Sequence, residues 1–179
     1  NAPAAQPHPV PGNGGHPVVS LIGNTPLVPL ARVRGPLAAG VSVCVKLEGQ
    51  NPGGSVKDRA ALSIILEAQR TGALAPDKTL LDATSRNAGI AYAMLGAALG
   101  FPVHLTLPSD VSPERVQVLR AYGAELTMTD PSEGTEGARR LAQDLATRKP
   151  ERYFYADQYN NPANPLAHFS TTGPEIWHQ

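Results

Sequence analysis

Lys57 is a candidate nucleophile, because it follows the glycine-containing segment NPGGS at residues 51–55. Apolar residues at helical spacing continue from there to Gly72, and Ser55 with Asp58 three positions later fits a capping box at a helix start. The positive end of a helix dipole disfavours an ammonium and so favours the neutral amine, which can attack a carbonyl and form a Schiff base. A solvated lysine in the first turn is the alternative, and the local residues alone favour it.

A second candidate site is the segment TSRNAG at residues 84–89, which places hydroxyl, amide and backbone N–H groups at the start of an alanine-rich helix. Free N–H groups and the partial positive charge of a helix start can hold an anion. Thr84 and Ser85 are also ordinary helix caps, so capping alone accounts for them equally well.

The segment DQYNNPANPLAHFSTTGPEIW, residues 157–177, is rich in polar side chains but has no spacing that demands a site. We therefore expect a connector that leads into a short helical run near residues 171–177. His168 could act as a general base, although a single histidine is more often structural. The sequence contains no nucleophile-elbow, zinc, Walker or dinucleotide motif, so we expect neither a metal nor a nucleotide.

The elements that must position these loops alternate along the chain. Residues rich in β-branched and apolar types alternate with runs of helical periodicity, which is typical of βαβ units. This pattern predicts an α/β, three-layer sandwich with a mostly parallel sheet, and ligands bind such sheets beyond the carboxyl ends of the strands. The expected strands are residues 41–47, 79–83, 102–108, 124–130 and 152–156, and the expected helices are 55–72, 87–100, 112–123 and 133–148.

The composition narrows the classes of function. Fifteen basic and fifteen acidic residues give a net charge of zero, which argues against nucleic acid or a membrane as partner and favours a small molecule. Cys44 is the only cysteine and lies in an apolar run, so we expect a buried, structural thiol and a reducing, cytoplasmic location. No apolar run is long enough to span a bilayer. Residues 1–17 lack periodicity, which predicts a disordered tail with His8 and His16 exposed to solvent.

Several long motifs together resemble the pyridoxal-phosphate-dependent β-replacement enzymes of fold type II. They are most similar to the B-type cysteine synthases, also called O-acetylserine sulfhydrylases. The resemblance runs from about residue 19 to residue 179. It is carried by the motifs LIGNTPLVPL, VKLEGQNPGGSVKDRAA, GALAPDKTLLDATS, MTDPSEGTEGARRLA and YNNPANPLAHFSTTGPEIW.

The resemblance implies a role for each matching residue. Lys57 would bond covalently to the aldehyde of pyridoxal 5'-phosphate and later move the substrate α-proton. Asn87 would hydrogen-bond the cofactor's phenolic oxygen, and Thr84, Ser85, Asn87 and Gln158 would hold the substrate carboxylate. The implied reaction replaces the acetate of O-acetylserine by sulfide, or by thiosulfate, to give L-cysteine.

Two positions depart from the family pattern TSGNTG, because Arg86 stands where the family has glycine and Ala88 where it has threonine. If position 86 requires a positive φ, the arginine carries a backbone penalty of about 1 kcal/mol. Loss of the threonine hydroxyl would remove a hydrogen bond to a charged group. The two changes either impair substrate binding or, through the Arg86 guanidinium, select a more anionic substrate such as a phosphorylated serine or thiosulfate.

The resemblance also divides the chain and leaves alternatives open. Residues 18–40 would pack with a C-terminal domain, residues 41–156 form the N-terminal α/β domain, and residues 157–179 begin the crossover to a C-terminal half that is absent. A homodimer and a serine acetyltransferase partner are implied. The alternatives are a truncated, non-catalytic homologue that binds or regulates a longer enzyme, and a sibling enzyme such as cystathionine β-synthase or diaminopropionate synthase.

Overall fold

A four-stranded parallel sheet forms the centre of the protein. The computed structural model describes residues 16–30, 41–84 and 86–179. The strands are β3 (Thr79–Ala83), β4 (Val103–Pro108), β5 (Glu125–Thr129) and β6 (Tyr153–Tyr155), in the spatial order β5-β4-β3-β6. Leu80 pairs with Val103, and Ala83 pairs with Thr106. These strands confirm the four predicted from residue 79 onward.

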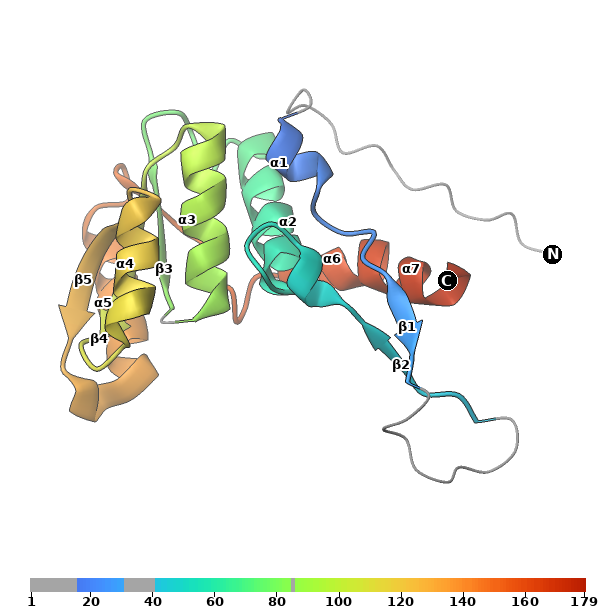
Figure 1. The fold of residues 1–179 in the computed structure, drawn as a ribbon. Coiled ribbons are helices and arrows are strands. Elements are labelled where there is room, and N and C mark those ends of the chain that lie inside the picture. The colour runs from blue at the N-terminus through green and yellow to red at the C-terminus, as the bar shows by residue number, and fades with distance from the viewer. Residues whose placement is uncertain (1–15, 31–40, 85) are drawn as a thin grey trace.

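Helices cover both faces of the sheet, which confirms the three-layer prediction (Figure 1). Helix α5 (Gly134–Arg148) packs on one face, while α3 (Asn87–Leu99) and α4 (Pro113–Ala121) lie on the other. Helix α2 (Lys57–Arg70) packs against α3 on the side away from the sheet. The short 3-10 helices η1 (Glu48–Gln50) and η2 (Pro131–Glu133) precede α2 and α5.

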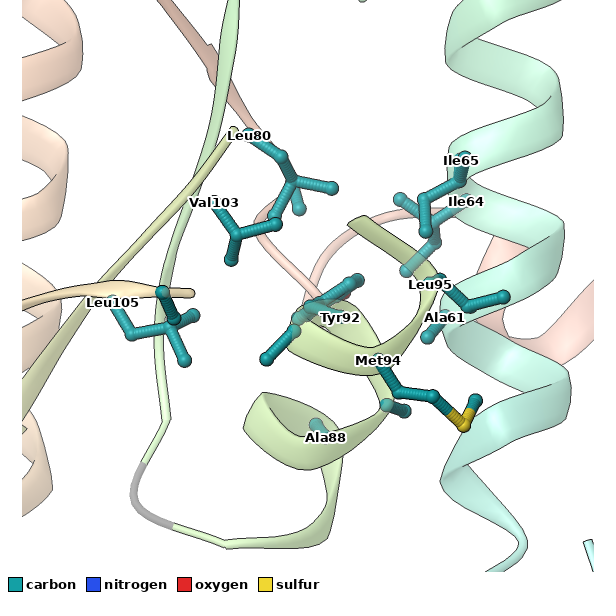
Figure 2. Packing of buried hydrophobic residues seen from close by; sticks show 14 of the residues in the cluster. Ala61, Ile64, Ile65, Leu80, Ala88, Tyr92, Met94, Leu95, Val103 and Leu105 are labelled. Carbon is teal, nitrogen blue, oxygen red and sulfur yellow. The ribbon is translucent and has the colours of Figure 1, made fainter. Parts of the chain in front are cut away.

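The core follows from the alternation of side chains along the buried strands. Leu80 and Leu105 point toward α3, whereas Leu81 points toward α5. Tyr92 lies on α3 between the sheet residues and helix α2, whose Ile64 and Ile65 pack from the far side (Figure 2). The largest hydrophobic cluster therefore joins β3 and β4 to both α3 and α2, and it fixes how these two helices lie.

The N-terminal segment forms a small, separate ribbon. Helix α1 (Pro17–Ser20) is followed by β1 (Leu27–Pro29), which pairs antiparallel with β2 (Cys44–Lys46). Cys44 is exposed, so the prediction of a buried thiol was wrong: a two-stranded ribbon has no second layer among the described residues to cover it.

The predicted tail needs one correction. His16 is half-buried and its Nδ1 accepts a hydrogen bond from the Val18 N–H, while Pro17 begins α1. These two residues therefore start an ordered helix and are not part of a tail. Residues 1–15, including His8, and residues 31–40 lie outside the described part of the chain.

The segment after β6 is more helical than predicted. Helix α6 (Ala163–Ala167), the π-helix η3 (His168–Thr172) and helix α7 (Gly173–His178) follow one another without a break. Helix α6 packs against α2. The expected connector is thus limited to residues 157–162, and helical structure starts eight residues before the predicted run at 171. Over the described ranges, no helix has the length and apolarity needed to cross a membrane.

Candidate functional site

Lys57 is the first residue of α2 and follows a tightly turned loop. Gly54 has a φ of +80°, a conformation that glycine adopts without strain. The Ser55 hydroxyl accepts a hydrogen bond from the Lys57 N–H at 3.2 Å. The Lys57 side chain is half-buried, and within the described residues its ammonium has no hydrogen-bond or ion-pair partner. A lysine in this state is available for covalent chemistry.

Asp58 holds the loop in a different way from the predicted capping box. Its carboxylate accepts a hydrogen bond from the Gly53 N–H at 2.5 Å, and not from the Ser55 N–H. Asp58 is fully buried, and burial raises its pKa. A Cβ added to Gly53 would lie 2.5 Å from Asp58 Oδ1, so only glycine fits at this close approach. The buried carboxylate and Gly53 together fix the chain just before Lys57.

Arg59 anchors the same helix turn through two carboxylates. The guanidinium is almost fully buried and makes paired hydrogen bonds to Glu48 on η1, at 2.8 Å each, and to Glu175 on α7, at 2.6 and 2.7 Å. Its Nη1 also donates to Thr171, and its Nη2 to Thr25. Paired contacts of this planar group restrain orientation as well as distance. Helix α2 is therefore tied to η1, to the N-terminal segment and to α7.

Glu175 is the second centre of this network. Lys46 Nζ lies 2.7 Å from its carboxylate, and the Asn24 N–H donates to it at 2.8 Å. Burial alone would raise the pKa of Glu175, but the hydrogen bonds from Arg59, Lys46 and Asn24 lower it to about 2. The pKa of Glu48 is lowered as well, because the hydrogen bonds it accepts, first from Arg59, outweigh its burial. Both carboxylates thus stay ionised beside the Lys57 turn.

His168 lies close to Lys57, which the sequence did not indicate. Burial lowers the pKa of His168, and the nearby charges of Lys57 and Arg59 lower it further. Its Nδ1 is 3.0 Å from the Thr172 hydroxyl. The π-helix that begins at His168 widens the turn at this point, and such turns are frequent at functional sites. The His168 side chain therefore lies within electrostatic reach of the Lys57 ammonium.

The second loop begins α3 at the end of β3. Thr84 is buried, and its hydroxyl accepts a weak hydrogen bond from the Arg86 N–H at 3.4 Å. Asn87 is exposed at the first position of α3. Ser85 lies outside the described residues. Figure 1 shows that α2 and α3 both begin at the end of the molecule where β3 finishes, so Lys57 and Asn87 stand at neighbouring helix starts.

Arg86 does not carry the backbone penalty considered above. Its φ is −130° and its ψ is −153°, which is extended backbone that any residue adopts. Its side chain is exposed and, among the described residues, has no ion-pair partner. Ala88 is buried, so a hydroxyl at this position would lie inside the loop. The two departures from the family pattern are compatible with an ordinary helix start.

Gln158 comes from the loop after β6 but lies against the end of β3. Its side-chain amide is 3.5 Å from the Ala83 carbonyl, and its backbone N–H donates to Asp82 at 3.4 Å. The structure thus brings Gln158 to the same strand end as the residue 84–87 loop. Sequence reasoning missed Asp82, although a carboxylate inside the apolar strand TLLDA was a visible signal.

The described residues fit one half of a pyridoxal-phosphate site. An unpaired, half-buried lysine and an amide at a neighbouring helix start suit an aldehyde-bearing ring with a phenolic oxygen. Over the same residues, no group of three or more histidine, cysteine or acidic side chains could hold a metal ion.

Comparison with known proteins agrees with this chemistry. The family described as pyridoxal-phosphate dependent enzyme matches residues 18–179. A cysteine synthase from Aquifex aeolicus is 52% identical over 163 residues, which are 90% of this chain and 50% of the relative. Cysteine synthase B from Escherichia coli is 53% identical over 158 residues, or 88% of this chain and 51% of the relative.

The fold is shared as well. The crystal structure of a cysteine synthase from Entamoeba histolytica superposes with a TM-score of 0.86 at 38% identity, over 94% of this chain and 50% of the other. The chain therefore spans about half the length of these relatives. Since the family match covers nearly all of the chain and the fold agrees, this chain belongs to the pyridoxal-phosphate-dependent enzymes of fold type II.

Proposed function

We propose that the chain is the lysine-bearing part of a cysteine synthase that makes L-cysteine from O-acetylserine and sulfide, or S-sulfocysteine where thiosulfate is the sulfur donor. The observation that carries this is the half-buried, unpaired Lys57 at the start of α2, beside the start of α3. The names of the relatives support the choice of reaction. When bound, pyridoxal 5'-phosphate supplies an electron sink for the substrate's α-carbon.

Each residue of the chain has a distinct task in this proposal. Lys57 holds the cofactor and afterwards carries the α-proton on its Nζ. Asn87 donates its side-chain N–H to the cofactor's phenolic oxygen. Together with Asn87, the side chains of Thr84, Ser85 and Gln158 would donate hydrogen bonds to the substrate carboxylate and orient the α-carbon toward Lys57.

Covalent trapping tests the lysine assignment. The chain is mixed with pyridoxal 5'-phosphate, the visible absorption band is recorded, and borohydride reduction followed by peptide mapping locates the label. We expect the label on Lys57 and its loss in Lys57→Ala. Lys78, whose ammonium has no hydrogen bond or ion pair within the described chain, is the matched control: Lys78→Ala should keep the band. Equal labelling of several lysines would overturn the assignment.

In this proposal Arg86 additionally favours binding of a more anionic activated serine, such as O-phosphoserine, at the site that takes O-acetylserine. Its backbone is unstrained and its guanidinium is exposed and unpaired among the described residues, so the side chain is free to meet an anion at the helix start. Titration of the pyridoxal-phosphate-loaded chain with O-phosphoserine and O-acetylserine, before and after Arg86→Gly, tests this. We expect the variant to lose about tenfold in its preference for the phosphorylated compound. An unchanged preference would refute the role.

The remaining assignments concern the whole enzyme. We propose a cytoplasmic homodimer that acts on an amino-acid substrate and has serine acetyltransferase as a protein partner. The family match supports the amino-acid substrate. Sedimentation of the protein alone and with serine acetyltransferase tests the homodimer and the complex with the transferase. A monomer that does not bind the transferase would refute both.

A further inference from the structure

Asp82 is a buried carboxylate at the strand end where the two substrate loops meet. It is 1% exposed and sits two residues before Thr84. One of its oxygens accepts a hydrogen bond from the Ala83 N–H at 2.8 Å, and the other lies 3.4 Å from the Gln158 N–H. A buried carboxylate costs free energy unless it is well hydrogen-bonded, so its presence at this point calls for a role.

A third contact links Asp82 to the helix that follows the second loop. The Tyr92 hydroxyl donates a hydrogen bond to the Asp82 carboxylate. Tyr92 is buried on α3, where Figure 2 shows its ring between the sheet and helix α2. One side chain therefore touches β3, α3 and the loop after β6 at the same time. Thr84 follows β3 and Asn87 begins α3, so Asp82 joins the two elements that carry these residues.

The second substrate loop depends on the same carboxylate. Besides the Gln158 N–H, the Gln158 side-chain amide reaches back to the Ala83 carbonyl, and the Gln158 carbonyl accepts from the Asn164 side chain. Asp157, the neighbour of Gln158, has a φ of +42°, so the chain turns sharply at this contact. The turn itself is closed by the Asn160 and Asn161 N–H groups, which donate to the Asp157 carbonyl at 3.0 and 2.9 Å. The bonds at 3.4 and 3.5 Å are the ones that join Gln158 to β3.

We propose that Asp82 is a positioning residue that holds Gln158 against the end of β3 at Thr84, beside the start of α3 at Asn87, so that these residues form one site for the substrate carboxylate. This rests on the proposed function for its choice of ligand, but the joining of the loops does not. Asp82 acts through Gln158 and Tyr92 and does not itself touch the substrate.

The surroundings of Asp82 make its contact with Gln158 sensitive to pH. Burial raises the pKa of Asp82 to about 7, although hydrogen bonds from the Ala83 and Gln158 N–H groups and from Tyr92 oppose this. The charge of Asp157 raises it further, and the other titratable groups that face this cluster are Tyr155 and, from α5, Arg139. Above pH 7 the ionised carboxylate accepts more strongly from the Gln158 N–H than the protonated acid does.

Nuclear magnetic resonance of the chain tests the contact between Asp82 and Gln158 without any ligand. The Gln158 amide shift is followed from pH 5 to 9, and amide exchange is measured for residues 157–161, in the unmodified chain, Asp82→Asn and Tyr92→Phe. In the unmodified chain we expect the Gln158 amide shift to change with a midpoint near pH 7, and this change to disappear in Asp82→Asn. Exchange of the Gln158 amide should become about tenfold faster in Asp82→Asn. Thr106→Val, which removes a buried hydrogen bond to Ala138 on the other face, is the control and should leave this loop unchanged.

Binding of L-serine to the pyridoxal-phosphate-loaded chain tests the consequence for the site. L-serine has the α-carboxylate but no acetyl group, and we expect its Kd to rise about tenfold in Asp82→Asn and less in Tyr92→Phe. An unchanged Gln158 amide in both variants overturns the proposal. If the unmodified chain does not bind L-serine, the proposed function fails, whereas the exchange result still decides the role of Asp82.

Discussion

Replacing Glu175 by glutamine should weaken the anchor of the Lys57 helix by a predictable amount. The Glu175 side chain is 17% exposed, and its pKa falls from 4.5 to about 2 in the folded protein. Each pKa unit corresponds to about 1.4 kcal/mol, so the ionised carboxylate stabilises the fold by about 3 kcal/mol at pH 7. Removing one partner of a buried ion pair costs a similar amount, about 3 to 5 kcal/mol. We therefore expect Glu175→Gln to lower the free energy of unfolding by about 3 kcal/mol.

The pH dependence makes the prediction sharper. Because the folded-state pKa is lowered, the stabilisation is fully present above pH 4.5 and is lost as the pH falls toward 2. At pH 3 the difference between the two proteins should shrink to about 1.4 kcal/mol. Urea unfolding followed by far-ultraviolet circular dichroism at pH 7 and pH 3 measures both values.

Glu67→Gln is the matched control for Glu175→Gln. Glu67 also pairs with an arginine, Arg70, through two hydrogen bonds, but both side chains are exposed, and exposed pairs contribute little. A Glu175→Gln effect no larger than that of Glu67→Gln at pH 7 would refute the reasoning, as would an effect of the same size at both pH values.

Two further substitutions test features near and far from the site. Gly53→Ala would place a Cβ 2.5 Å from Asp58 Oδ1, so it should destabilise the protein by about 1 to 3 kcal/mol in urea unfolding. Gly49→Ala is the control and should change the stability little, because the added Cβ meets no atom within 4 Å. Equal effects of the two substitutions would contradict this prediction. His104 is buried with a lowered pKa, so protonation costs stability as the pH falls below about 6.5. His104→Gln should therefore lose less stability than the unmodified chain between pH 7 and pH 5, and parallel losses would count against it.

The parallel sheet was predictable because its signals are local. The strand TLLDA was predicted with both of its ends correct, since a short apolar run lies between polar turns. Helix α5 was predicted within one residue from its periodicity. Motif resemblance was what singled out Lys57, because the residues around it were equally compatible with a surface charge.

The features that were not predicted depend on contacts between distant residues, which the periodicity of the sequence does not indicate. Arg59 meets Glu175 across 116 residues of sequence, and no local pattern relates the two. The apolar run around Cys44 indicated a strand, and a strand is there, but its burial depends on which layer covers it. The helical start at Ala163 was missed because the segment is rich in polar side chains without a helical spacing, which suggested a connector.

The Arg59 and Glu175 network also bears on the order in which the chain folds. Asn24 bonds Glu175 across 151 residues, and Gln179 bonds the Thr25 carbonyl across 154. Contacts of such separation close large loops, so they form late, after the locally connected sheet and its helices. On the ribosome, the N-terminal partners wait until residues 175–179 have emerged. The helix that starts at Lys57 can thus form early, but it receives its final anchors among the last steps of folding.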